Sequence, residues 1–290
     1  MNLTNNTKIL PSSMSIPNFI KITARCIQFI STKLTVLFAH KLFTSPFNFK
    51  TPDREKTMWQ SAQKKRIKII TLNKEIDVLS YGYSTKKVLL IHGWSGRSTQ
   101  LFTVADKLLE KGYMVISFDG PAHGKSEGKQ TSMLDFLEAI KQINQEFGPF
   151  DSAIGHSFGG MALYNISNEL NLKNFVTIGS GDKVSTIINR FIEDLNLKPK
   201  IATKLKQFYD KKWNRDVDNH ASSELAKQIK IPILVVHDSI DGDVAVSCAV
   251  NIRQSLQKGS LLITQGLGHT KILRDKNTMS RVVEFITQNQ

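Results

Sequence analysis

The sequence predicts an α/β fold: an open, mostly parallel, doubly wound sheet of about eight strands with helices on both faces. Two observations lead to this prediction. From residue 66 onward, short apolar runs alternate with helical patterns, as expected of successive βαβ units. Such runs are typical of strands buried on both faces of a parallel sheet. With 290 residues and 40% hydrophobic content, the chain can form one large domain or two small ones.

The first 65 residues differ from the rest of the chain in their charge. They carry ten lysines and arginines against two acidic residues, and so most of the net charge of +14. Apolar residues recur near a 3.6-residue period in 16–45, which predicts a helix, and two prolines in 43–54 end it. A second short helix is expected at 53–64, whereas residues 1–15 are expected to be disordered or loosely attached. We therefore expect a basic helical N-terminal extension over 1–65.

The remaining residues, 66–290, carry the alternating strands and helices. The first two runs indicate a hairpin that turns at Asn73 and Lys74. Strands are expected at 66–72, 75–82, 87–93, 113–120, 150–156, 174–180, 231–238 and 260–266. Helices are expected at 98–111, 132–147, 158–170, 246–257 and 272–288.

One connection in this domain is too long for a simple crossover. About fifty residues separate the strand at 174–180 from the strand at 231–238. Helical patterns at 183–195 and 199–213 predict extra helices within about 182–220, and 221–230 would form the crossover helix itself. Inserted there, the extra helices would lie over the carboxyl ends of the strands as a small helical lid.

The helical pattern at 16–45 is compatible with two environments. It packs on the core or at a dimer interface, or it lies as a basic amphipathic element on an anionic membrane surface. Nucleic acid is not an expected partner, because no nucleic-acid motif or aromatic–basic repeat occurs. The sequence does not indicate an oligomeric state.

The chain is expected to be cytoplasmic, either free or membrane-associated. Its longest apolar region, 26–40, is interrupted by Lys33 and is too short to span a bilayer. The first fifteen residues are polar and do not resemble a signal peptide. The two cysteines, Cys26 and Cys248, lie far apart and suggest neither a disulfide framework nor a metal site, which fits a reducing compartment.

The stretch AIGHSFGG, residues 153–160, places Ser157 among three glycines. G-x-S-x-G falls here where a strand should end and a helix begin, which is the context of a nucleophile elbow. In such an elbow the serine occupies a strained turn, so its neighbours must be small. We expect Gly155 and Gly159 to clear space around the serine and Gly160 to let the next helix pack on the sheet. Ser157 is the candidate nucleophile.

A serine needs a base, and the base needs an orienting carboxylate. His269 follows the last strand in a glycine-flanked loop and is the candidate base; the alternative is a loop histidine without function. The segment HDSIDGDV, 237–244, follows the preceding strand and offers Asp238, Asp241 and Asp243. We favour Asp241, because the loop must leave the strand tip before a carboxylate can reach the histidine. Asp238 and Asp243 remain alternatives.

The oxyanion formed by nucleophilic attack needs backbone N–H donors. One is expected from Phe158, which follows the nucleophile at a helix N-terminus. The other is expected from Trp94, in the loop after the strand at 87–93, where Gly93 allows a close backbone approach. The Trp94 ring is expected to line the acyl pocket; the alternative is a packed aromatic side chain without a catalytic role.

Five segments of the sequence occur in the order found in α/β-hydrolase fold enzymes. The sequence resembles this family over about 66–290. In that family the acid commonly stands in D-x-x-V-P, which Asp241 to Val244 match, with Ala245 in place of proline. The family element D-x-P-x-H-G-x-S matches 119–126, whose His123 is expected to be structural. The five segments are HGW (92–94), FDGPAHGKSEG (118–128), GHSFGG (155–160), HDSIDGDV (237–244) and GLGHTKIL (266–273).

The resemblance implies an esterase- or lipase-like serine hydrolase that cleaves a small-molecule carboxylic ester through an acyl-enzyme. Serine at the nucleophile position argues against the dehalogenase and epoxide hydrolase chemistry of relatives that use aspartate. Thioesterase, lipase, other acyl hydrolase and carbon–carbon hydrolase activities stay open, because one triad serves them all. The alternative from another class is a non-catalytic hydrolase-like binding protein. No metal or organic cofactor is expected.

Overall fold

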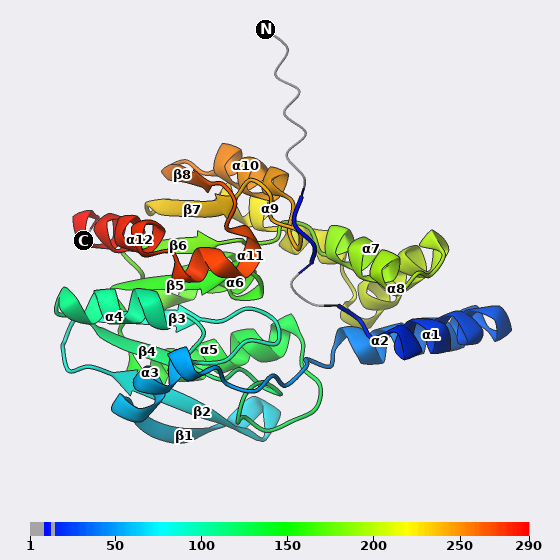
Figure 1. The fold of residues 1–290 in the computed structure, drawn as a ribbon, viewed down its shortest axis with the longest axis horizontal. Coiled ribbons are helices and arrows are strands. Elements are labelled where there is room, and N and C mark those ends of the chain that lie inside the picture. Colours follow the sequence, from blue (N-terminus) through cyan, green and yellow to red (C-terminus); the bar gives the residue numbers. More distant parts are fainter. Residues whose placement is uncertain (1–8, 13–14, 290) are drawn as a thin grey trace, which may run out of the picture.

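The computed structural model describes residues 9–12 and 15–289. Its strands form one eight-stranded sheet in the order β1-β2-β4-β3-β5-β6-β7-β8 (Figure 1). β1 pairs antiparallel with β2, and β2 with β4, whereas the other neighbours are parallel. The mostly parallel sheet confirms the predicted fold class. The strands are β1 (Gln63–Ile69), β2 (Lys74–Tyr81), β3 (Lys87–Ile91), β4 (Met114–Phe118), β5 (Ser152–His156), β6 (Asn174–Ile178), β7 (Ile233–Asp238) and β8 (Gly259–Thr264).

The continuous apolar runs of the sequence form strands that are covered on both faces. Every residue of β5, β6 and β7 is buried, because helices cover both faces of the sheet. Asn73 closes the first hairpin in the left-handed conformation, with φ of 50°. One face carries α3 (Lys56–Ser61), α4 (Phe102–Glu110) and α12 (Lys276–Gln288), and the other carries α5 (Met133–Phe147), α6 (Phe158–Leu170), α9 (Ser222–Ala226) and α10 (Val246–Ser255).

A separate group of four helices lies beside the sheet and is called the cap here (Figure 1). It consists of α1 (Asn18–Ile30), α2 (Thr32–Phe43), α7 (Val184–Asp194) and α8 (Pro199–Trp213), which share one apolar cluster. The inserted helices therefore pack with the N-terminal helices rather than forming a lid alone. No helix among the described residues is long and apolar enough to cross a bilayer.

The helix predicted at 16–45 is two helices in the structure. The chain leaves the helical conformation at Ser31, where φ is −157°, and Ser31 Oγ accepts a hydrogen bond from Leu34 N–H at 3.3 Å. Serine is a favoured N-cap residue, because its side chain satisfies an amide that has no partner within the helix. The 3.6-residue period continues across this break, so periodicity alone could not reveal it.

The residues before β1 are tied to the rest of the molecule. Leu10 N–H donates to the Ile240 carbonyl at 3.1 Å, and Ser12 Oγ donates to Asp243 at 2.7 Å. The expectation that residues 1–15 are loosely attached is therefore wrong for Leu10 and Ser12, while 1–8 and 13–14 lie outside the described residues. Sequence periodicity misses such contacts because they join an irregular segment to a distant loop.

A buried ion pair fixes the short turn before α3. Glu55 is only 3% exposed and accepts two hydrogen bonds from Arg97, at 2.7 Å from Nε and 3.0 Å from Nη2. Thr99 Oγ1 donates a third, at 2.7 Å. Arg97 and Thr99 belong to the loop after β3, so the pair joins the N-terminal segment to the loop that also carries Trp94.

Arg97→Ala should lower the free energy of unfolding by about 3 kcal/mol, because the carboxylate of Glu55 would stay buried without its counterion. Urea unfolding followed by circular dichroism measures this loss. The control is Lys65→Ala, which removes an ion pair between Glu146 and a Lys65 side chain that is 60% exposed. Its effect should stay below about 1 kcal/mol. Equal losses in the two variants would contradict a structural role for the buried pair.

Candidate active site

Ser157 stands between β5 and α6 in a strained turn. Its φ is 51° and its ψ is −114°, a backbone conformation that is rare for residues other than glycine. The Ser157 amide donates to the Ile178 carbonyl at 2.8 Å, which ties the turn to the end of β6. The turn has the strand-to-helix geometry of a nucleophile elbow.

The three positions around Ser157 that carry glycine have no space for a Cβ atom. A Cβ on Gly159 would overlap the carbonyl oxygens at the end of β3, and a Cβ on Gly155 would overlap the Gly159 carbonyl. A Cβ on Gly160 would lie 2.9 Å from Ser180 Cβ. All three positions lack the space for a larger residue, so α6 reaches the strand tips only with glycine there.

His269 and Asp241 meet above the carboxyl ends of the strands. His269 Nδ1 donates to Asp241 Oδ2 at 2.7 Å. Burial by itself would lower the pKa of His269, but the hydrogen bond and the charge of Asp241 raise it above 6.5. Burial would raise the pKa of Asp241, but His269 and the amides of Val244 and Asp243 hold it below 3.8. The pair is therefore a carboxylate that orients an imidazole.

The two alternative acids have other partners. Asp238 accepts hydrogen bonds from Thr264 Oγ1 at 2.7 Å and from Leu267 N–H at 3.0 Å, and so supports the loop that carries the histidine. Asp243 accepts from Ser12, and its charge raises the pKa of His269. Of the three aspartates, Asp241 makes the hydrogen bond to the imidazole.

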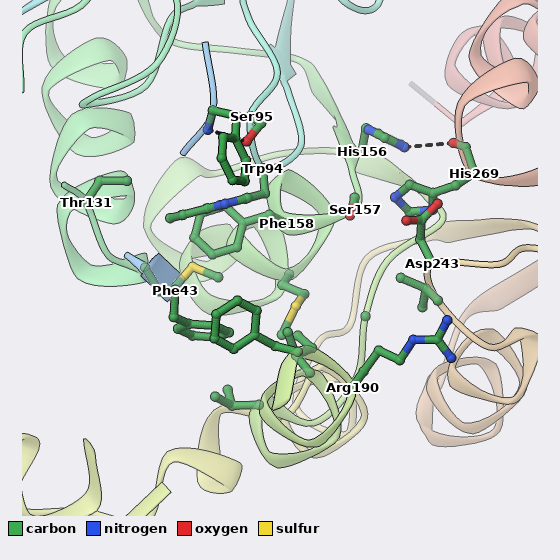
Figure 2. A pocket seen from close by; sticks show the side chains of 18 of the residues that line it. Phe43, Trp94, Ser95, Thr131, His156, Ser157, Phe158, Arg190, Asp243 and His269 are labelled. Carbon is green, nitrogen blue, oxygen red and sulfur yellow. Dashed lines mark hydrogen bonds between the residues drawn. The ribbon is translucent and has the colours of Figure 1, made fainter. Parts of the chain in front are cut away.

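The candidate oxyanion donors flank Ser157. Phe158 opens α6, so its amide has no partner within the helix. A Cβ on Gly93 would lie 3.1 Å from Ser157 Cβ, which shows how closely the Trp94 turn approaches the serine. In the described part of the chain, no acceptor takes a hydrogen bond from either the Phe158 or the Trp94 amide. The rings of Trp94 and Phe158 contact edge to face at 5.2 Å (Figure 2).

Three further histidines near the site are buried, and burial makes them neutral. It lowers the pKa of His92 to about 4, and those of His123 and His156 to about 3. His92 Nε2 accepts from Gly120 N–H at 2.9 Å, and His123 Nδ1 lies 3.0 Å from the Pro121 carbonyl. Both therefore hold the loops after β3 and β4, as expected for His123.

His156 supports the candidate base. Its Nε2 lies 3.1 Å from the carbonyl oxygen of His269, and the two rings lie 4.7 Å apart (Figure 2). The neutral imidazole thus donates a hydrogen bond to the backbone of the loop that carries His269. His156, which directly precedes Ser157, therefore positions the candidate base His269.

Sequence reasoning missed several positioning residues. His237 Nε2 donates to the Val244 carbonyl at 2.9 Å and lies 3.6 Å from Asp241 Oδ2. His237 stands four residues before Asp241, and this short spacing could have marked it as a residue that supports the candidate acid. Gln100 Oε1 accepts from Gly93 N–H at 3.0 Å and steadies the Trp94 turn. No local pattern marks Gln100, because its role depends on how the loop folds back.

Ser157 and His269 line the same cavity without a direct hydrogen bond between them in the described structure. Such a bond is often long or poorly aligned before substrate binds. The cavity has a volume of about 760 Å³ and lies between the strand tips and the cap. Figure 2 shows Phe43 facing it from the cap side, opposite Ser157 and His269.

Three side chains at the site are of types that can bind a metal ion. Among the described residues, Asp241, Asp243 and His269 bring ligand atoms within 4.8 Å of one another. Both oxygens of Asp241 are already engaged, Oδ2 by His269 and Oδ1 by the amides of Asp243 and Val244 at 2.8 and 3.0 Å. N–H donors point at these oxygens where a cation would have to lie, so the donor set suits a proton-transfer pair better.

Comparison with known proteins relates this geometry to a family. The family model of the alpha/beta hydrolase fold matches residues 86–193, and the model described as TAP-like protein matches residues 206–290. A search of curated protein sequences finds no match.

Solved structures show the same fold. An esterase of Pyrococcus furiosus is 20% identical, with a TM-score of 0.65 over 84% of this chain and 98% of the other. A putative lipase of Acinetobacter baumannii is also 20% identical, with a TM-score of 0.61 over 84% of this chain and 99% of the other. A bacterial membrane phospholipase A is 16% identical, with a TM-score of 0.62 over 93% and 96% of the two chains.

The two matched ranges contain β3 to β8 and most of the helices that cover the sheet. The chain therefore has the α/β-hydrolase fold.

Proposed function

We propose that the protein is a serine hydrolase that cleaves carboxylic esters through an acyl-enzyme. The observation that carries this proposal is the 2.7 Å hydrogen bond between His269 and Asp241, at a cavity that Ser157 also lines. Because His269 Nδ1 donates to the carboxylate, Nε2 keeps the lone pair that can accept the Ser157 proton. The esterase and lipase names among the structural neighbours agree with this assignment.

The mechanism follows from these positions. Ser157 Oγ attacks the ester carbonyl while His269 Nε2 accepts its proton, and Asp241 stabilises the imidazolium that forms. The Phe158 and Trp94 amides donate to the oxyanion. The imidazolium returns the proton to the leaving alcohol, and the acyl group stays on Ser157. His269 then takes a proton from water, whose oxygen attacks the acyl carbon. The imidazolium returns this proton to Ser157 Oγ as the bond between Oγ and the acyl carbon breaks, and the acid is released.

The cavity supports an apolar acyl group. Cap residues Phe43, Ile187 and Phe191 line it together with Met161 of α6. Its volume of about 760 Å³ exceeds what a short acyl chain needs. The four-helix cap encloses this volume and favours a medium or long acyl chain.

Ser157→Ala should lower kcat for an ester by about 10⁴-fold, because the nucleophile acts with its base as a unit. Hydrolysis of p-nitrophenyl esters measures this. Ser280→Ala is the control, since that exposed hydroxyl bonds only to the Lys276 carbonyl of its own helix. A fluorophosphonate probe should label Ser157. Absence of an adduct there would favour the non-catalytic binding protein.

Asp241→Asn should lower kcat by about 10⁴-fold, whereas Asp243→Asn should lower it less than about tenfold. In the wild type, kcat/KM should fall with falling pH through the pKa of His269, above 6.5, because the base must be neutral. Without the Asp241 carboxylate, burial dominates and the midpoint of the residual activity should move to lower pH. Equal pH profiles for wild type and Asp241→Asn would contradict the assignment.

In a series of p-nitrophenyl esters, kcat/KM should rise with acyl length by up to about fourfold per methylene, which corresponds to about 0.8 kcal/mol of buried apolar surface. Ile187→Trp should move the optimum to shorter chains, because the indole would fill part of the cavity. Ile70→Trp, at a site 76% exposed and outside the cavity, should leave the optimum unchanged. A flat series from acetate to laurate would refute an apolar acyl site. A thioester tested alongside separates esterase from thioesterase activity.

A further inference from the structure

The outer face of α1 is apolar and uncovered. Phe29 is 95% exposed and Ile30 76% exposed, and Phe19 and Ile22 are exposed as well. With Cys26, these positions fall within an arc of about 100° on a helix of 3.6 residues per turn. Scattered single apolar residues are ordinary on a protein surface, but an aligned row of large ones indicates a contact surface.

This exposure does not come from loose attachment of the helix. Ala24 on the opposite side is fully buried in the apolar cluster of the cap. Near the end of the helix, Gln28 Oε1 accepts a hydrogen bond from Lys198 N–H, at the start of α8, at 2.7 Å. The helix is therefore fixed in orientation, with one apolar side packed and a second apolar side turned outward.

The outer face of α2 continues the surface. Leu34 is 51% and Leu37 44% exposed. The exposed residues Lys33 and Lys41 fall on the same side of this helix. In Figure 1, α1 and α2 form the lower part of the cap, beneath α7 and α8, and extend away from the sheet.

The charge around this surface is strongly positive. Residues 18–43 contain four basic side chains and no acidic one, and 184–213 contain seven basic and three acidic ones. More than half of the net charge of +14 therefore belongs to the cap. A second copy of the chain in a symmetric contact would place like charges against each other. An anionic lipid surface combines the apolar depth and the negative charge that this surface matches.

We propose that the outer faces of α1 and α2 bind an anionic lipid bilayer. Phe19, Ile22, Phe29 and Ile30 would enter the boundary between headgroups and acyl chains, and the flanking cations would contact lipid phosphates. The same two helices contribute Ile20, Leu42 and Phe43 to the cavity wall. On the proposed hydrolase function, the substrate is then a lipid ester that passes from the bilayer through the cap to Ser157.

Co-sedimentation with vesicles tests this proposal on the full-length protein. Binding is expected to vesicles of phosphatidylglycerol and phosphatidylcholine, to be weak with phosphatidylcholine alone, and to fall with added salt. The double variant Phe29→Glu/Ile30→Glu should bind at least tenfold more weakly. Ile70→Glu changes an equally exposed apolar residue outside the cap and should bind like the wild type. Arg25→Gln/Lys33→Gln should weaken binding to the anionic vesicles.

The three surface variants, Phe29→Glu/Ile30→Glu, Ile70→Glu and Arg25→Gln/Lys33→Gln, should hydrolyse p-nitrophenyl butyrate in solution at wild-type rates, which shows that they are folded. Unchanged vesicle binding by Phe29→Glu/Ile30→Glu would overturn the proposal. So would a wild-type dimer that this variant converts to a monomer, with no vesicle binding by either. Ser157→Ala should still bind vesicles. Vesicle binding by a wild type without any esterase activity would refute the hydrolase function and leave the docking surface intact.

Discussion

The close approach of α6 to the tips of β3 and β5 is the constraint on which the candidate site depends. It requires glycine at 155, 159 and 160, because a Cβ at any of these positions would collide with backbone or with Ser180. It also forces Ser157 into a φ of 51°. This strained turn places the serine hydroxyl and the Phe158 amide next to the Trp94 turn. The other candidate groups lie around that point.

Several loops are held around the turn by buried polar contacts rather than by regular structure. His92 joins the loop after β3 to the loop after β4, His156 donates to the backbone of His269, and His237 holds the loop of Asp241. Burial keeps these three imidazoles neutral by lowering their pKa values. His269 is the exception, because Asp241 raises its pKa. The Asp241 carboxylate thus gives the candidate base a raised pKa, whereas the structural histidines have lowered pKa values.

The N-terminal residues take part in both the site and the cap. Ser12 bonds to Asp243 beside the candidate acid, Ser95 Oγ accepts from Phe47 N–H at 2.9 Å, and the Glu55–Arg97 pair anchors the turn before α3. Between these contacts, α1 and α2 complete the cap over the cavity. The segment that lies outside the alternating pattern of the sequence therefore encloses the cavity, and its outer face gives the cap its apolar and basic surface.

The sequence by itself determined the fold class, the strands and helices within a few residues, and the candidates Ser157 and His269, with Asp241 favoured among three aspartates. These depend on local signals: continuous apolar runs, glycine spacing and positions just after strands. The tertiary structure decided which aspartate bonds to His269, that the helix predicted at 16–45 breaks at Ser31, and that its two parts pack on the inserted helices. It also placed Gln100 and Ser12 beside the site. These features depend on contacts between residues far apart in the chain, for which a single sequence carries no local pattern.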